Sequence, residues 1–315
     1  MSSRDAGPIV VAGEALMDLV LDTGGRLVGH SGGGPYNVAR TIGRLDQPVL
    51  YLGRLSTDAF GARLGRELES DAVGVETVVA TDAPTTLAVA ELDESGGAEY
   101  RFYADSTSAP GLVVNEATSV LPPRIGTFYL GTLGLVFEPM ATTLESLVGE
   151  LDHDTLVALD PNCRPTTIHD PSAYRGRLDR LLRRTDVIKA SEDDLAWLRP
   201  GAHPVDAARA LLTPNAVVAL VTLGGRGALV VTHEDVVEVE ATPVDVVDTI
   251  GAGDAFMGAF LAHWRARGLG RADLTRPGEV VDAVRFACHV AAITCSRAGA
   301  DPPRRAEIGR DAWGD

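Results

Sequence analysis

The chain has 315 residues, of which 45% are hydrophobic and 23% are charged, a composition typical of globular proteins. Its 28 Lys and Arg residues against 44 Asp and Glu residues give a formal net charge of −16, which argues against nucleic acid or an anionic membrane surface as a partner. No run of about 18 apolar residues lacks glycine, proline and charge, so no membrane span is predicted. Three cysteines, Cys163, Cys288 and Cys295, are too few for a disulfide framework, and we expect a cytoplasmic protein.

Short β-branched runs alternate with longer amphipathic stretches, a pattern typical of βαβ units and a mostly parallel sheet. Strands are predicted at residues 8–12, 48–55, 77–81, 126–132, 155–162, 187–191 and 216–224. Helices are predicted at 35–45 and 58–73, between further strands, and around 253–267 and 279–297 after a hairpin-like stretch at 227–241. The length fits two domains, or one large α/β unit with an insertion.

Two segments interrupt this alternation. Residues 16–34 and 85–104 alternate apolar and polar side chains on both sides of a turn, which predicts two antiparallel hairpins. We therefore assign 13–34 and 85–105 to a small β-sheet lid, and 1–12, 35–84 and 106–315 to an α/β core. Since a sheet of two hairpins is marginal alone, the lid is expected to close over a ligand, pair with a second subunit, or do both.

The segment DTIGAGD, from Asp248 to Asp254, leads directly into a helical pattern. Gly251 and Gly253 allow a tight turn whose N–H groups point at one spot, and the following helix adds its positive end, so an anion is expected there. Asp254 would lie beside that anion, placed to accept a proton from an attacking hydroxyl. It could equally be only the cap of the helix, and spacing alone leaves the two interpretations even. The segment matches neither a Walker A loop nor the dinucleotide fingerprint.

GAGDAFMGAF, with its upstream Asp-Thr, resembles the C-terminal signature of the ribokinase-like (PfkB) carbohydrate kinases, and GGGPYNVA at 32–39 resembles their other signature. YLGRLSTDAFGARL, LDPNCRP, VIKASEDDLAWL and VTLGGRGALV follow the order of further family segments, so the resemblance covers nearly the whole chain. It implies a ribokinase-like α/β fold, with a mostly parallel central sheet flanked by helices and a small inserted β-sheet lid. It also implies an ATP-dependent sugar kinase.

The resemblance assigns roles to individual positions. Asp254 matches the catalytic base that deprotonates the sugar hydroxyl. Gly251, Ala252 and Gly253 match the anion hole around the transferring phosphoryl group. The positions that would hydrogen-bond sugar hydroxyls are Asp18, Gly33, Gly34 and Asn37. Without the resemblance, Asp18 would be interpreted as an exposed strand carboxylate.

An acidic cluster at 191–194 matches the family's magnesium-ordering segment. Ser191 replaces an asparagine of the family and Asp194 replaces a glutamate. Because Asp is one methylene shorter, contact with Mg²⁺ through water is expected, and no dedicated metal cage is needed. The same cluster also begins a helix and favours its dipole, and both roles can hold.

The nucleotide is expected to lie along Thr222, Gly224 and Gly227, with its adenine near the helix segment 287–291, as the resemblance implies. The resemblance also implies a monovalent cation, K⁺ in relatives, at Asp248 and the carbonyl of Ile250. Prolines at 302 and 303 stand where some relatives offer a serine ligand, which argues against activation by potassium.

The sugar is expected to be a neutral ketose, most directly fructose. The acidic and small residues after Tyr103 would repel a sugar acid, although Arg164 is a possible partner of a carboxylate or phosphate. Tyr103 or Arg101 could reach the sugar from the lid, but alternation along a strand allows only one of them to do so. A 2-keto-3-deoxygluconate kinase and a ribokinase are the alternatives within the family.

Two alternatives come from other classes of protein. One is a member that senses sugar or nucleotide without turnover, which the intact Asp254 and glycines disfavour. The other is a dinucleotide-binding oxidoreductase, which the missing glycine fingerprint after the first strand disfavours. A homodimer through the lids is expected from the resemblance.

Overall fold

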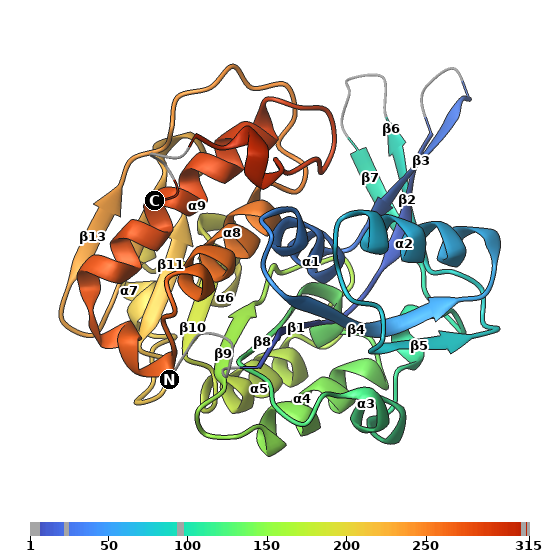
Figure 1. Ribbon diagram of the computed structural model, residues 1–315, viewed down its shortest axis with the longest axis horizontal. Coiled ribbons are helices and arrows are strands. Elements are labelled where there is room, and N and C mark those ends of the chain that lie inside the picture. The colour runs from blue at the N-terminus through green and yellow to red at the C-terminus, as the bar shows by residue number, and fades with distance from the viewer. Residues whose placement is uncertain (1–6, 22–24, 93–97, 310–312, 314–315) are drawn as a thin grey trace.

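The computed structural model describes residues 7–21, 25–92, 98–309 and 313. They form a large twisted sheet with helices on both faces, and a second, smaller sheet that projects beyond one end of the first (Figure 1). In this part of the chain no helix has the length and apolarity that crossing a bilayer requires.

The large sheet has nine strands among the described residues, in the order β13-β12-β11-β10-β9-β8-β1-β4-β5. Their bounds are β1 Ile9–Ala12, β4 Val49–Ser56, β5 Val78–Thr81, β8 Thr127–Gly131, β9 Leu156–Asp160, β10 Val187–Ser191, β11 Val218–Thr222, β12 Ala228–Val231 and β13 Val236–Val239. All neighbours pair in parallel except β11 with β12 and β12 with β13. The predicted hairpin-like stretch at 227–241 is this antiparallel edge.

Helices cover both faces of this sheet, because its central strands are apolar on both sides. Along β1, Ile9 and Val11 face one core, while Val10 and Ala12 face the other. The helices on the first face are α1 Gly34–Arg44, α2 Ala59–Ser70, α8 Ala252–Ala266 and α9 Pro277–Cys295. Those on the second face are α3 Val114–Val120, α4 Met140–Glu150, α5 Pro171–Leu182, α6 Glu192–Leu198 and α7 Pro204–Arg209.

The small sheet is built from the two predicted hairpins. Its strands are β2 Leu16–Leu21, β3 Leu27–Gly32, β6 Leu87–Leu92 and β7 Ala98–Tyr103, in the order β3-β2-β6-β7. Each hairpin is antiparallel, and β2 and β6 join the hairpins in parallel. The turn predicted within 85–104, at the sequence Glu-Ser-Gly-Gly (94–97), lies outside the described residues. The ribokinase-like α/β fold class is confirmed.

Short 3-10 helices complete the chain between these elements. They are η2 Ala109–Gly111, η3 Thr132–Leu135, η4 Gly224–Arg226, η5 Arg271–Thr275 and η6 Arg305–Glu307. The first two follow β7 and β8, and η3 joins the base of the small sheet, where Leu133 packs with Leu16 and Ala88. This contact anchors the small sheet on the core.

Candidate active site

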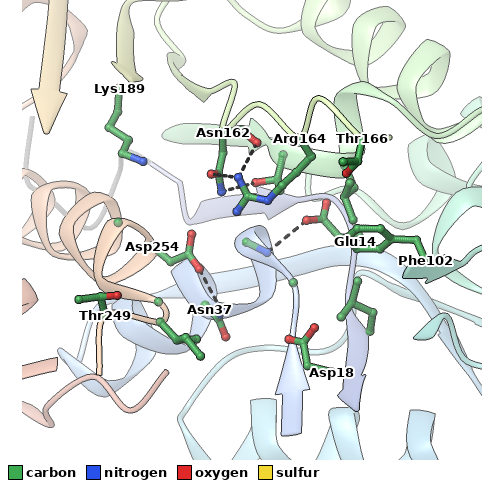
Figure 2. Close-up of a pocket in the computed structure, with 18 residues that line it drawn as sticks. Glu14, Asp18, Asn37, Phe102, Asn162, Arg164, Thr166, Lys189, Thr249 and Asp254 are labelled. Atoms are coloured by element: carbon green, nitrogen blue, oxygen red, sulfur yellow. Dashed lines mark hydrogen bonds between the residues drawn. The ribbon is translucent and has the colours of Figure 1, made fainter. Parts of the chain in front are cut away.

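A cavity of about 780 Å³ lies between the small sheet and the ends of the central strands. It sits beyond the carboxyl ends of β1, β8 and β9, where open α/β sheets place their ligands. Figure 2 shows its walls converging from segments far apart in the chain. The lining residues are Glu14, Leu16, Asp18, Gly33, Gly34, Asn37, Phe102, Thr132, Leu133, Asn162, Arg164, Thr166, Lys189, Thr249, Ile250, Gly251, Gly253 and Asp254.

Asp254 occupies the first turn of α8 and points into this cavity (Figure 2). Gly251 begins the helix with a φ of 74°, a left-handed conformation that favours glycine. Asn37 Nδ2 donates a 2.9 Å hydrogen bond to Asp254 Oδ2. Burial raises the pKa of Asp254 to about 7, while the Asn37 bond and the Lys189 charge oppose that rise. A carboxyl that titrates near neutrality is suited to accept a proton during a reaction.

The N-terminus of α8 forms an anion cradle beside that carboxyl. The first N–H groups of a helix have no intrahelical acceptor, and no side chain caps α8. Gly251 and Gly253 line the cavity, and Ala252 is the first residue of the helix between them. A Cβ at Gly253 would lie 3.0 Å from Lys189 Nζ, so a side chain there would crowd the ammonium. The helix dipole and the N–H groups of this turn together favour a phosphate at this point, although the Ala252 N–H already donates to the Thr249 carbonyl oxygen at 3.2 Å.

Lys189 is a cavity-lining side chain that the sequence analysis missed. It lies on β10, is 4% exposed, and its Nζ donates a 2.8 Å hydrogen bond to the buried Asp160 Oδ2. Burial disfavours the ammonium, but the carboxylates of Asp160 and Asp194 outweigh burial and raise the pKa of Lys189. A charged ammonium therefore stands at the cradle. A lysine inside the otherwise apolar strand VIKAS was the available signal, since lysine is almost never buried unpaired.

Four of the predicted sugar-contacting residues line the cavity: Asp18, Gly33, Gly34 and Asn37. Burial raises the pKa of Asp18 to about 6, while the Arg164 charge lowers it, so Asp18 is not a fully exposed strand carboxylate. Gly33 has a φ of 112°, and a Cβ at Gly34 would lie 2.3 Å from Thr132 Oγ1, so both positions require glycine. Among the described residues, Asn37 Oδ1 is buried without a hydrogen-bond partner. A ligand hydroxyl could supply that missing donor.

Arg164 also reaches the cavity, but its guanidinium is held by its own loop. Nη1 donates to Asn162 Oδ1 at 2.6 Å and to the carbonyls of Asn162 and Cys163 at 3.2 Å. The loop follows β9, as the motif LDPNCRP suggested. Its remaining donors are free to meet a ligand oxygen.

Tyr103 was expected to reach the sugar from the small sheet, but the register of β7 points it away from the cavity. Phe102 lines the cavity, whereas the Tyr103 side chain is 51% exposed and lies outside it. Arg101 is also exposed, because successive side chains of a strand point to opposite faces. Residues two apart in a strand share a face, so the prediction that alternation separates Arg101 from Tyr103 was wrong. Both lie on the face away from the cavity, and the aromatic ring of Phe102 lines it.

Ser191 and Asp194 form a capping box at the start of α6. Asp194 Oδ1 accepts from the Cys163 N–H at 2.6 Å, and Oδ2 accepts from the Ser191 hydroxyl at 2.6 Å. Both carboxylate oxygens are thus already hydrogen-bonded, and neither residue lines the cavity. The structure therefore shows Ser191 and Asp194 capping the start of α6. Their role in ordering water around a metal ion stays a prediction.

The predicted nucleotide edge lies along the turn between β11 and β12, outside the cavity wall. Thr222 ends β11, and Gly224 has a φ of 58° with no atom near its Cβ position, which leaves open space beside the turn. Gly227 has a φ of 97°, and a Cβ there would lie 2.0 Å from the Val239 carbonyl oxygen. Gly227 is therefore required by the turn itself, and its contact with a nucleotide stays a prediction.

Asp248 ties the loop before α8 to the segment after α9. Its Oδ1 accepts from the Ile250 N–H at 3.0 Å and its Oδ2 from the Gly299 N–H at 2.8 Å. Each oxygen keeps a lone pair that a cation could use. In the described part of the chain, no three His, Cys, Asp or Glu side chains are grouped closely enough to hold a metal ion by themselves.

Comparison with protein families and curated relatives gives a consistent result. The family described as "pfkB family carbohydrate kinase" matches residues 7–306. A fructokinase of Rhizobium leguminosarum bv. trifolii is 32% identical over 81% of this chain and 78% of its own length. A probable fructokinase-5 of Arabidopsis thaliana is 31% identical over 94% of both chains.

Solved structures agree with these relatives. A fructokinase of Xylella fastidiosa with bound ATP has a TM-score of 0.84 at 27% identity, over 93% of both chains. A fructokinase of Vibrio cholerae O395 with fructose, ADP and calcium ion has a TM-score of 0.81 at 25% identity, over 94% of this chain and 95% of that one. The same arrangement of two sheets thus occurs in proteins with a nucleotide and a sugar bound.

Proposed function

The chain belongs to the pfkB family of carbohydrate kinases, and from that membership we propose that it phosphorylates fructose with ATP as the phosphoryl donor. As a carbohydrate kinase it is a phosphotransferase with an alcohol group as acceptor. The observation that carries the mechanism is the Asp254 carboxyl, buried beside the anion cradle of α8 and held by Asn37. The observation that carries the choice of sugar is the fructose named in the Vibrio cholerae structure, together with the acidity of the cavity.

The transfer uses side chains and backbone groups that line the same cavity. Asp254 accepts the proton of the sugar hydroxyl as that oxygen forms its bond to the γ-phosphorus, and ADP leaves from the opposite side. Asn37 fixes the orientation of the carboxylate through its 2.9 Å hydrogen bond. The cradle at Gly251, Ala252 and Gly253 stabilises the charge that builds on the phosphoryl oxygens. The Lys189 ammonium adds positive charge beside the same point.

Magnesium is the divalent cation that we propose for the nucleotide. Mg²⁺ keeps several waters and takes phosphate oxygens, so it needs no dedicated cluster of protein ligands. When bound with ATP, the ion neutralises charge between the phosphates. Asp194 would reach it only through water, since both of its oxygens already accept protein hydrogen bonds. A monovalent cation would use the free lone pairs of Asp248 and the carbonyl of Ile250.

A neutral sugar fits the charges of the cavity better than a sugar acid. Three carboxyl groups line the cavity, from Glu14, Asp18 and Asp254. With pKa values of about 6 and 7, Asp18 and Asp254 supply its negative charge at neutral pH, against two cations, Arg164 and Lys189. Of these cations, Lys189 is paired with Asp160, and Arg164 donates to Asn162 through one of its nitrogens, so the cavity holds little unpaired positive charge for a carboxylate. Asp18 and the free Oδ1 of Asn37 are suited to accept from sugar hydroxyls.

The experiment is an ADP-release assay with ATP and Mg²⁺ against fructose, ribose and 2-keto-3-deoxygluconate. Turnover on fructose with the highest kcat/KM of the three supports the proposal. Preference for the keto acid would retain the kinase but refute the charge argument, and would assign its carboxylate to Arg164. Binding of sugar without ADP release would instead indicate a sensing protein.

We also propose a homodimer formed through the small sheet. One face of that sheet covers the cavity through Leu16 and Phe102, while Leu27 on β3 is 56% exposed. A second copy would cover such exposed apolar surface. Light scattering after size exclusion decides the matter, since a single species of 33.1 kDa would refute the dimer.

A further inference from the structure

Glu14 is a buried carboxyl in the cavity wall that the mechanism above does not use. It follows β1, and its side chain has no exposed surface. Its Oε1 accepts from the Gly34 N–H at 3.1 Å, and its Oε2 accepts from the Gly134 N–H at 3.0 Å. Figure 2 shows the first of these bonds crossing from the strand to the start of α1. One side chain thus joins two backbone segments that lie 100 residues apart in the chain.

The two N–H groups belong to the ends of elements that form the floor of the cavity. Gly34 is the first residue of α1, and its N-cap Gly33 has no side chain to cap the helix. Gly134 lies in η3, directly after β8. Unpaired N–H groups at such ends are costly when buried, so Glu14 supplies an acceptor that the local sequence lacks.

The segments fixed in this way carry the groups that face the sugar. α1 carries Asn37, whose amide holds Asp254, and η3 carries Thr132 and Leu133. The two segments approach closely, because a Cβ at Gly34 would lie 2.3 Å from Thr132 Oγ1. A small shift of α1 against η3 would therefore displace Asn37 and change the shape of the floor.

We propose that Glu14 is a positioning residue for the acceptor sugar: by holding the Gly34 and Gly134 N–H groups it sets the start of α1 against η3. This inference rests on the proposed kinase function, since it assigns the floor of the cavity to the sugar. Glu14 acts through the backbone, and it is not the proton acceptor. Burial raises the pKa of its carboxyl to about 8, while the hydrogen bonds from the Gly34 and Gly134 N–H groups oppose that rise.

The test compares Glu14→Ala and Glu14→Gln with Asp170→Ala as the matched control. Asp170 caps α5 by accepting from two backbone N–H groups, those of Ser172 and Ala173, and it does not line the cavity. Each alanine variant thus removes one carboxyl group that accepts hydrogen bonds from two backbone N–H groups. The measurements are kcat, KM for the sugar that the wild type accepts, KM for ATP, and amide hydrogen exchange of segments 33–37 and 132–136.

For Glu14→Ala we expect a rise of about tenfold or more in the KM for sugar, with the KM for ATP within about twofold of the wild type. Glu14→Gln keeps one acceptor oxygen and should show an intermediate rise. Exchange should quicken in both segments for Glu14→Ala and not for Asp170→Ala, which should leave both KM values within about twofold.

An unchanged KM for sugar in Glu14→Ala, or an equal rise in both KM values with a lower Tm, would overturn the proposal. If Glu14→Ala does not fold, the same criteria apply to Glu14→Gln. Wild-type protein without turnover on any sugar would refute the proposed function instead. In that case the exchange of the two segments, with sugar affinity measured by calorimetry, still decides the role of Glu14.

Discussion

Replacing Asp254 with asparagine should remove proton acceptance while leaving the cavity in place. The amide of Asp254→Asn can turn its oxygen toward Asn37 Nδ2, so the 2.9 Å hydrogen bond of the wild type has a substitute. The side chain keeps its volume and its position in the first turn of α8. The change therefore isolates the loss of a base from the loss of a contact.

The size of the effect follows from the pKa of this carboxyl. With a pKa of about 7, Asp254 is ~90% ionised at pH 8, so an assay at that pH measures an almost fully active wild type. A positioned general base contributes about 10²–10⁴-fold, which corresponds to about 3–5 kcal/mol of the barrier. We expect kcat of Asp254→Asn to fall by that factor, with the Kd for fructose changed by less than about threefold.

The assay is coupled ADP release at pH 8, with fructose affinity from calorimetry. Asp18→Asn is the matched control, because it makes the same isosteric change to a carboxyl that lines the same cavity. That variant should raise the KM for fructose and leave kcat within about tenfold. A kcat for Asp254→Asn within tenfold of the wild type would refute the assignment of the base. Equal losses of kcat in both variants would show that the cavity, and not the proton acceptor, had been damaged.

Three further outcomes are expected. Because Asp254 must be ionised to accept a proton and its pKa is raised to about 7, kcat/KM in the wild type should fall about tenfold per pH unit below pH 7, and a flat profile from pH 5 to 8 would contradict this. Lys189→Met leaves the Asp160 carboxyl buried without its partner and should lower the free energy of unfolding in urea by about 3–5 kcal/mol, with part of the loss recovered when Asp160→Asn is added. Phe102→Ala should raise the KM for fructose several-fold while Tyr103→Ala leaves it unchanged, and the reverse order would mean that the register of β7 differs in the working enzyme.

The local patterns of the chain predicted the elements well, because they depend on periodicity that neighbouring residues share. Alternating strands and amphipathic helices predicted the parallel sheet, and the two hairpins were recognisable from their alternation. The glycines before Asp254 predicted the turn and the helix start that the structure contains. These features need no knowledge of distant contacts.

The sequence did not reveal how distant segments combine in the cavity. Glu14 sits in an apolar stretch, and nothing near it shows that it meets Gly34 and Gly134. The strand VIKAS showed an unusual lysine, but its partner Asp160 lies on another strand, so the pair itself could not be predicted. The sequence analysis placed Tyr103 or Arg101 toward the sugar, but alternation along β7 does not say which face is covered, since a shift by one residue exchanges every side chain of a strand.

The hydrogen bond between Asn37 and Asp254 joins residues 217 positions apart, and α1 and α8 pack in the same core. A ribosome would therefore have made the floor that we assign to the sugar before it added the carboxylate that we propose as the proton acceptor. A chain that ends before α8 would retain Asp18 and Asn37 but have no group to take a proton. It would also leave the apolar side of α1 uncovered, since α8 and α9 close that face of the sheet. The chain would thus gain its activity at the same stage of synthesis at which its last apolar surface is buried. Before that stage it would not react with ATP, and its exposed apolar surface would be open to chaperones and proteases.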